Sequence, residues 1–298
     1  MRQLATRTRK TYLALATVAA LTLGVLVGVA VGAGLNKKSA TVDVDPGEIG
    51  TVTAKCEQGE KLLSGGFKDA EFTGQQDTAP LLVPNASRKQ GGKKWTVEAQ
   101  NFGEQDGNLT AHVYCREGRK LAKESASVNV AAQGAGTATA ECNQGQKVRS
   151  GGFENPDYGL DLDQVPALLP FESRKQGGRK WVVSAFNFSA ATGKLTAYAY
   201  CGDGKGLKKV SETTEVPVSD FDTGQLGNST ATAKCNEDQR VISGGFDNPD
   251  FGAESETDPQ LFPNLSQKSG SKKWKARGIN NSSVEPGTWK VFAYCEKK

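Results

Sequence analysis

Histidine is almost absent from this chain, with His112 the only one among 298 residues. Catalysis through a serine–histidine pair, histidine acid–base chemistry or a histidine-ligated zinc therefore has no starting point. The six cysteines form no C-x-x-C pair, which is the usual spacing of a structural zinc site. We accordingly expect no metal, no cofactor and no enzymatic activity.

A basic surplus is also missing from the body of the chain. There are 37 Lys and Arg against 33 Asp and Glu, but Arg2, Arg7, Arg9 and Lys10 precede every acidic residue. Residues 36–298 therefore carry 33 charges of each sign. Because a nucleic-acid-binding domain normally has a basic surplus over its own body, we expect no nucleic-acid partner.

One long stretch lacks charge altogether, from residue 12 to residue 35. As a helix these 24 residues would measure about 36 Å, enough to cross a hydrocarbon core of about 30 Å. The positive-inside rule makes residues 1–11 a cytoplasmic basic tail, 12–35 a signal anchor, and the remainder extracellular. The alternative is a cleaved signal and a secreted protein, because small residues near Gly28 and Gly32 could form a cleavage site.

Three glycines, Gly24, Gly28 and Gly32, lie four residues apart within this segment. Positions four apart share one face of a helix, and small residues there let two membrane helices approach closely. This face is therefore a candidate for homodimerisation through the membrane. The alternative is that the glycines only reflect how common small residues are in membrane helices.

The rest of the chain repeats one module three times. Each copy opens on a similar stretch, "TVTAKC" (51–56), "TATAEC" (137–142) or "TATAKC" (230–235). The motif "SGGF", a tryptophan and an asparagine then recur at fixed spacing before a closing "YC". The recurring residues are Phe67, Phe153 and Phe246; Trp95, Trp181 and Trp274; Asn101, Asn187 and Asn280. Such spacing indicates triplication of a single module.

The period of 86 residues decides how we interpret the repeat. A β-trefoil also has three repeats, but each is about half this length and the three share one core. Units of 86 residues are long enough to bury a core of their own. We therefore expect three tandem domains without linkers, at 36–124, 125–210 and 211–298.

Within a module the strand signals are short and regularly spaced. "TVTAKC" alternates polar and apolar residues, as a strand with two different faces does. Gly107, Gly193 and Gly287 each mark a turn into the last strand. Six or seven such strands predict an all-β fold of three tandem β-sandwich modules after one transmembrane helix. The tryptophan lies too far from the first cysteine for an immunoglobulin domain.

Six cysteines allow fifteen pairings, but the repeat favours one of them. If each module closes on itself, the bonds are Cys56–Cys115, Cys142–Cys201 and Cys235–Cys295. Closing a loop of about 60 residues stabilises a fold by about 4 kcal/mol in the chain-entropy model. An extracellular location would allow the oxidation.

Three further features have a structural and a functional interpretation. His112 is replaced by Tyr198 and Phe292 in the other copies, which is typical of a packing position. "SGGF" lacks the glycine spacing and the Lys of a phosphate loop, so we expect a bulge or a close backbone approach. An acidic stretch after "SGGF" could hold calcium, best at Asp157, Asp161 and Asp163, but charge balance against the basic stretch is favoured.

That basic stretch, "SRKQGGKKW" in the first copy, leaves two interpretations open. One is a cationic loop presented three times to cell-wall glycan, another envelope polyanion or lipid headgroups. The other, favoured by the neutral net charge, is a hairpin turned by Gly91 and Gly92, with lysines that protect a sheet edge. The candidate binding residues are Arg88, Lys89, Lys93, Lys94, Arg174, Lys175, Arg179, Lys180, Lys268, Lys272 and Lys273.

The combined pattern of cysteine, "SGGF", tryptophan, asparagine and closing "YC" resembles modules of uncharacterised secreted or membrane-anchored proteins of actinobacteria. The likeness covers residues 39–295 and implies a sandwich fold at the cell surface, with no catalytic residue. We therefore expect a structural or adhesive role at the cell envelope. A carboxylate-based glycan hydrolase is the least favoured alternative, because no acidic pair recurs in all three copies.

Overall fold

The computed structural model describes residues 35–298, apart from residue 76 and the segments 160–164 and 253–257. Nearly all of the predicted membrane span, the tail before it and the glycines Gly24, Gly28 and Gly32 lie outside the described residues. Asp161 and Asp163 do so as well. The described part of the chain contains no helix that is long and apolar enough to cross a bilayer.

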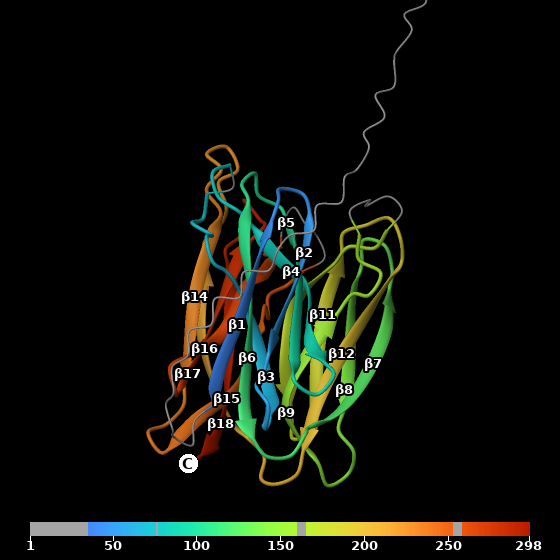
Figure 1. Ribbon diagram of the computed structural model, residues 1–298. Helices are drawn as coiled ribbons and strands as arrows, with labels where there is room; N and C mark the ends of the chain where they lie inside the picture. The colour runs from blue at the N-terminus through green and yellow to red at the C-terminus, as the bar shows by residue number, and fades with distance from the viewer. Residues whose placement is uncertain (1–34, 76, 160–164, 253–257) are drawn as a thin grey trace, which may run out of the picture. The chain divides into compact units, whose positions relative to one another are not determined.

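The regular elements of the described chain are all β-strands, as predicted, and each repeat contributes six (Figure 1). The first repeat forms β1 (Asn36–Val44), β2 (Ile49–Lys55), β3 (Glu60–Asp69), β4 (Leu82–Gln90), β5 (Lys94–Asn101) and β6 (Gly107–Glu117). The second forms β7 (Ala122–Val130), β8 (Ala135–Glu141), β9 (Lys147–Glu154), β10 (Leu168–Gln176), β11 (Lys180–Asn187) and β12 (Gly193–Gly202). The third forms β13 (Lys208–Val216), β14 (Gly227–Lys234), β15 (Gln239–Asp247), β16 (Leu261–Ser269), β17 (Lys273–Asn280) and β18 (Gly287–Lys297).

The strands form three antiparallel sheets of six, and every sheet is shared between two repeats. Their strand orders are β1-β6-β3-β16-β17-β14, β13-β18-β15-β10-β11-β8 and β2-β5-β4-β9-β12-β7. Each repeat therefore splits into two three-stranded layers that belong to different sheets. The layers continue into the neighbouring repeats through β4–β9, β10–β15 and β16–β3. Because the third repeat pairs back onto the first, the arrangement is a closed ring with approximate threefold symmetry.

The expectation of three tandem domains, each with its own core, is wrong. Residues Gly34–Lys298 form one compact unit, and one hydrophobic cluster runs through all three repeats. The expected boundaries at 124/125 and 210/211 fall inside β7 and β13. The prediction was right that each repeat contains two facing layers. One edge strand of each layer, however, pairs with a strand of a neighbouring repeat.

Three phenylalanines of the "SGGF" motifs mark the centre of the unit. The ring centroids of Phe67, Phe153 and Phe246 lie 6.3–6.4 Å apart, with each pair nearly perpendicular. Edge-to-face contact of this kind is a favourable arrangement of aromatic rings. Since each ring comes from a different repeat, the centre of the core exists only when all three repeats are assembled.

The two glycines of "SGGF" explain how the repeats come so close. A Cβ on Gly151 would lie 2.1 Å from the ring of Trp181 in the same repeat. A Cβ on Gly152 would lie 2.3 Å from the carbonyl oxygen of Ser87 in the preceding repeat. The first glycine makes room for a buried tryptophan, and the second lets the neighbouring backbone approach, as the motif predicted.

The stretch "SRKQGGKKW" forms part of this junction. Ser87 lies opposite Phe153 in the pairing of β4 with β9, and its hydroxyl accepts a hydrogen bond from Trp95 Nε1 (3.0 Å). The backbone N–H of Lys89 donates to the hydroxyl of Tyr200 in the next repeat (2.6 Å). The equivalent bonds join Lys175 to Tyr294 (2.7 Å) and Lys268 to Tyr114 (2.8 Å), which completes the ring.

The predicted disulfides are confirmed: Cys56–Cys115, Cys142–Cys201 and Cys235–Cys295. Each one joins the two layers of its repeat. All three lie where strands such as β1 begin, and we call this the cystine end. It also holds the hairpin turns 91–93, 177–179 and 270–272. The nine connections at the opposite ends of the strands form the loop end.

The single core makes a direct prediction for Phe153→Ala. Removing a buried aromatic ring from a packed core costs about 3–5 kcal/mol. Because Phe153 contacts both other repeats, amide-exchange protection should fall across all three of them, and unfolding in denaturant should remain a single transition. Loss of protection in the second repeat alone would contradict a shared core.

Candidate binding surface

The candidate basic residues all lie in the half of the strands nearest the cystine end or in its turns, but strand alternation divides them into two groups. Lys89 and Lys175 are buried, at 4% and 7% exposure, while Arg88 and Arg174 are half-buried. Lys268, the equivalent of Lys89 within β16, is half-buried. The others belong to the hairpin turns and the strand starts after them, and are more open to solvent. The stretch is therefore part junction and part surface.

The buried lysines hold neighbouring repeats together. Lys89 Nζ donates to the carbonyl of Leu121 (3.2 Å) and lies 5.7 Å from the ring centre of Tyr200. Lys175 makes the same contacts with Leu207 and Tyr294. Burial, with the nearby cations Lys120 and Lys123, lowers the pKa of Lys89 to about 8. These two side chains therefore serve the junction and are not free to bind a ligand.

Arg88 and Arg174 form ion pairs across the repeat junctions. Arg88 Nε lies 2.6 Å from Glu154, and Arg174 Nε lies 3.2 Å from Asp247. Only the first residue of the acidic stretch takes part in these pairs. The described acidic residues that follow, such as Asp157 and Asp250, lie in loop-end connections far from the basic hairpin turns, and both ion pairs join different repeats, so the expected charge balance within one module is wrong.

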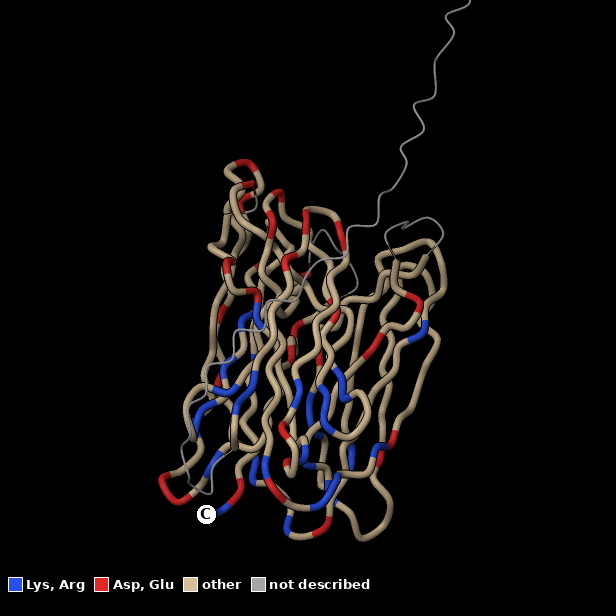
Figure 2. Tube along the Cα trace, in the orientation of Figure 1, with Lys and Arg blue, Asp and Glu red and all other residues tan. Residues whose placement is uncertain are grey.

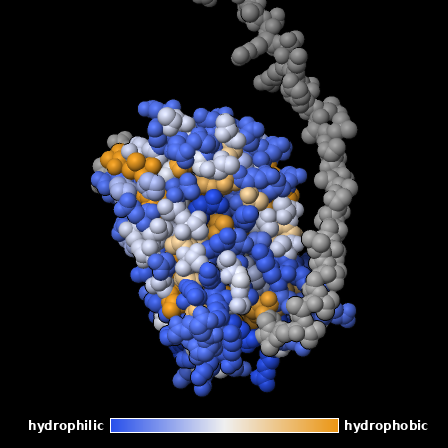
Figure 3. Space-filling view, turned by 90° about the vertical axis from the view of Figure 1, so that its left-hand side faces the viewer, coloured by the Kyte–Doolittle hydropathy of each residue, from blue (hydrophilic) through white to orange (hydrophobic). Residues whose placement is uncertain are grey.

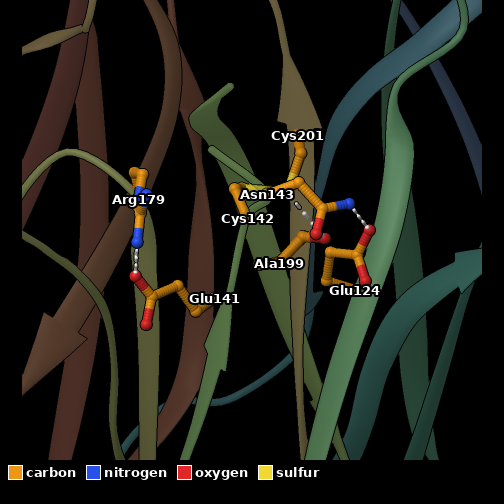
Figure 4. Close-up of a disulfide and its surroundings, with 7 residues drawn as sticks. All are labelled: Glu124, Glu141, Cys142, Asn143, Arg179, Ala199 and Cys201. Atoms are coloured by element: carbon orange, nitrogen blue, oxygen red, sulfur yellow. Dashed lines mark hydrogen bonds and ion pairs between the residues drawn. A yellow bond between two sulfur atoms is a disulfide. The ribbon is translucent and has the colours of Figure 1, made fainter. Parts of the chain in front are cut away.

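The three hairpin turns differ in how well their cations are neutralised. In the second repeat Arg179 pairs with Glu141, and Asn143 beside the disulfide donates to Glu124 (Figure 4). In the third repeat Lys272 pairs with Glu237. The first repeat has Lys55 at the position of Glu141, directly across from Lys94 in the pairing of β2 with β5.

The first turn is consequently the most cationic of the three. Lys55, Lys94 and Lys120 are exposed, and none of them makes an ion pair with any described residue. Lys120 lies close to Gly92 of the same turn. From the sequence the three turns were expected to be equivalent. The residue before the first cysteine of each repeat already separates the second turn from the other two, because it is Glu141 there and Lys55 or Lys234 in the other repeats.

Sequence reasoning missed a cluster of three arginines around one carboxylate at the cystine end. Glu296 lies 2.7 Å from Arg116 Nη1 and 2.9 Å from Arg240 Nη2, and it also pairs with Arg149. Arg149 in addition donates to the carbonyl of Lys205 (2.8 Å). The arginines come from all three repeats, so the cluster joins them around one carboxylate.

The signal for this cluster was a departure from the repeat. Arg149 stands where the other repeats have Leu63 and Ile242, and Glu296 stands where they have Arg116 and Gly202. Burial would raise the pKa of Glu296, but hydrogen bonds and charge from the arginines outweigh it and hold that pKa below its usual value.

Lysine and arginine lie mainly toward the cystine end of the strands, whereas aspartate and glutamate occur at both ends (Figure 2). The loop-end connections contain no lysine or arginine. Their acidic residues in the described chain are Asp45, Glu48, Glu71, Asp77, Glu104, Asp106, Asp157, Asp220, Asp222, Asp250, Asp258 and Glu285. The neutral total of residues 36–298 therefore combines a loop end whose connections contain only acidic charges with strands and a cystine end that contain both signs.

Other candidate chemistry is structural where the structure describes it. His112 is buried, and its Nδ1 lies 2.8 Å from the Ser39 hydroxyl. Burial raises the pKa of Asp69 to about 6, but this carboxylate has a structural role, because it accepts hydrogen bonds from the backbone N–H of Glu71 (3.3 Å) and of Leu82 at the start of β4 (3.0 Å). The described group closest to a metal site is Cys56, Glu60 and Cys115, and its two sulfurs are bonded to each other.

The cavity at the centre of the unit is also too small for a substrate. It measures about 30 Å³ and is lined by the glycines, phenylalanines, serines and tryptophans of the three junctions. Such a volume holds a water molecule or two, whereas pockets for organic ligands have about 300 Å³ or more. The surface, and not this cavity, is where a binding function is to be sought.

No protein-family model matches the chain, and no curated protein matches it either. The three disulfides indicate an extracellular or secreted protein, because such bonds form and persist in oxidising compartments.

The buried histidine predicts a pH effect on stability. Burial, reinforced by Lys37 and Lys68, lowers the pKa of His112 to about 3. The unfolded chain, with a histidine pKa of about 6.5, binds a proton that the folded chain does not. The stability that neutral His112 provides is therefore complete above pH about 6.5 and declines as the pH falls toward 3.

His112→Phe, which installs the residue of the third repeat, should remove this dependence. Relative to the unsubstituted protein, the variant should gain about 2 kcal/mol of unfolding free energy between pH 7.5 and pH 5. Urea unfolding of both proteins at the two pH values measures the difference. Parallel pH profiles would show that His112 does not titrate as described.

The arginine cluster predicts a different effect for Glu296→Gln. Three guanidinium groups would lose their shared negative partner, which should lower the unfolding free energy at pH 7 by about 1–3 kcal/mol. Glu237→Gln is the matched control, because Glu237 pairs with Lys272 in full solvent and its loss should have no measurable effect. Equal responses of the two variants in denaturant titrations would argue against a cluster of structural importance.

Proposed function

We propose that this protein is anchored in the cell membrane by residues 12–35 and has a structural or binding role at the cell envelope. The three disulfides carry the proposal, since each closes one repeat and together they use every cysteine of the chain. Their formation is consistent with export of residues 36–298 to the outer side of the membrane.

The packed interior of the unit and the charges on its surface support a binding or structural role over catalysis. Its interior is occupied by the ring of junctions between repeats, and its exposed charges are sorted to the two ends. The segregated cations also favour the related proposal that a polyanion, such as cell-wall glycan, is a ligand. A homodimer through Gly24, Gly28 and Gly32, and a carboxylate-based hydrolase, have no further support.

Fractionation of cells that express the full chain with a C-terminal tag tests the proposal. The tagged protein should stay in the membrane fraction after alkaline carbonate extraction, and external protease should remove the tag from intact cells. Replacing Arg2, Arg7, Arg9 and Lys10 by glutamate should reduce the fraction that protease reaches.

The secreted alternative makes a distinct prediction for the same experiment. A tagged protein found in the medium, with a mature N-terminus between Gly32 and Asn36, would establish cleavage and remove the anchor. A tag protected from protease in intact cells would contradict export altogether.

A further inference from the structure

We propose that the cystine end binds a bilayer surface that carries anionic lipid headgroups, so that the acidic loop end points away from the membrane. The inference rests on the proposed anchorage, because the anchor brings this end next to a bilayer. It goes beyond anchorage by naming the surface, its ligand and the resulting orientation of the unit.

The first support is the sorting of charge between the two ends. Connections at the cystine end contribute Lys93, Arg119, Lys120, Arg179, Lys205 and Lys272, against Glu57, Asp203, Glu237 and Asp238, so this end keeps an excess of cations. The loop-end connections contribute no cation at all, and the nearest basic residues along the chain include Lys68 at the end of β3 and Lys194 at the start of β12. An approaching anionic surface therefore meets attraction at one end and repulsion at the other.

The distance between the ends keeps these charges from cancelling. Strands of nine residues, such as β4, are about 30 Å long at about 3.3 Å per residue. At physiological ionic strength, exposed charges are screened beyond about 8 Å. A membrane at the cystine end thus interacts with the local cations and is almost unaffected by the acidic loops.

The second support is where the chain enters the unit. Strand β1 begins at Asn36, at the cystine end, directly after the predicted membrane segment. Lys37 and Lys38 are its next residues. Because consecutive residues span at most about 3.6 Å each, an anchor that ends at Leu35 leaves no linker between the bilayer and this end.

The third support is an excess of positive charge that the protein does not neutralise itself. Lys55, Lys94 and Lys120 surround the first hairpin turn without an ion pair among the described residues. Such groups can bind phosphate oxygens of headgroups without first giving up a protein partner.

The side chains at this end also indicate how contact is made. The large hydrophobic side chains that are exposed in the described chain are Phe102, Val218, Phe221 and Val284, and all belong to loop-end connections. Figure 3 shows a mainly hydrophilic surface over the lower part of the unit, where the cystine end lies. The cystine end should therefore bind by charge at the headgroup level, without inserting into the acyl chains.

The test uses residues 36–298, which contain every strand, the whole core and all three disulfides and so should fold without the anchor. Flotation with vesicles of phosphatidylcholine alone, or with about one third phosphatidylglycerol, measures binding. We expect binding only to the anionic vesicles, with most of it lost when salt rises from about 0.1 M to 0.5 M.

Two matched variants locate the surface. Lys94→Glu and Lys194→Glu make the same change of charge on exposed strand residues at opposite ends. Lys94→Glu should weaken vesicle binding several-fold, and Lys194→Glu should leave it within about twofold. Combining Lys55→Glu, Lys94→Glu and Lys120→Glu should weaken it at least about tenfold.

Several results would overturn the inference. Equal binding to both kinds of vesicle would remove the role of anionic lipid, and equal effects of the two matched variants would remove the role of the cystine end. Stronger binding to a soluble anionic glycan than to anionic vesicles would make the glycan the ligand. Because the fragment lacks residues 12–35, these failures are separate from a failure of anchorage in cells.

Discussion

The approach of one backbone to another at the "SGGF" motif is the contact on which the rest of the unit depends. Ser87 and Phe153 pair across the junction between β4 and β9 only because Gly152 has no side chain to block the carbonyl of Ser87. The same contact at the other two junctions turns three pairs of layers into three six-stranded sheets. Without it each repeat would have two further open sheet edges, which invite association with other chains.

Closure of the ring also determines what the surface can do. Strands that alternate in direction bring every second connection to the same end, so the repeats sort their connections into two sets. Selection can then act on the two sets independently while the junctions stay fixed. The loop-end connections contain no lysine or arginine, whereas the connections at the opposite end contain an excess of them.

Much of this structure could be predicted from the sequence, and the part that could not has a physical reason. Strand alternation, the hairpin glycines and the repeat itself led to all-β modules and the right disulfides. The pairing of β3 with β16 joins residues about 200 positions apart through a two-residue register, Phe67 with Ser266 and Lys68 with Leu265. A pairing of only two residues on each strand, between strands far apart in the sequence, leaves no periodic pattern. The glycines correctly predicted a close backbone approach, but the sequence did not show that the approaching backbone belongs to another repeat.

The candidate binding surface could likewise be predicted only in part from the sequence. The basic hairpins were found from their repetition, yet repetition could not show that Lys89 is buried against Tyr200 while Lys94 is exposed. The arginine cluster was missed because Arg149 and Glu296 occupy positions where the repeats disagree. Residues that the repeats share mostly build the interior, and residues in which they differ create the uneven surface.

The uneven surface charge changes how the neutral net charge of residues 36–298 should be interpreted. A total of zero over residues 36–298 favoured a solvated hairpin, on the assumption that opposite charges lie close enough to compensate each other. The loop-end carboxylates lie about 30 Å, several screening lengths, from the cations of the cystine end, where Glu57, Asp203 and Glu237 pair with only some of those cations. Each end therefore presents its own charge to whatever approaches it. The total charge of the folded unit therefore describes neither end, because the loop end is acidic while the cystine end combines an excess of cations with carboxylates that pair with some of them.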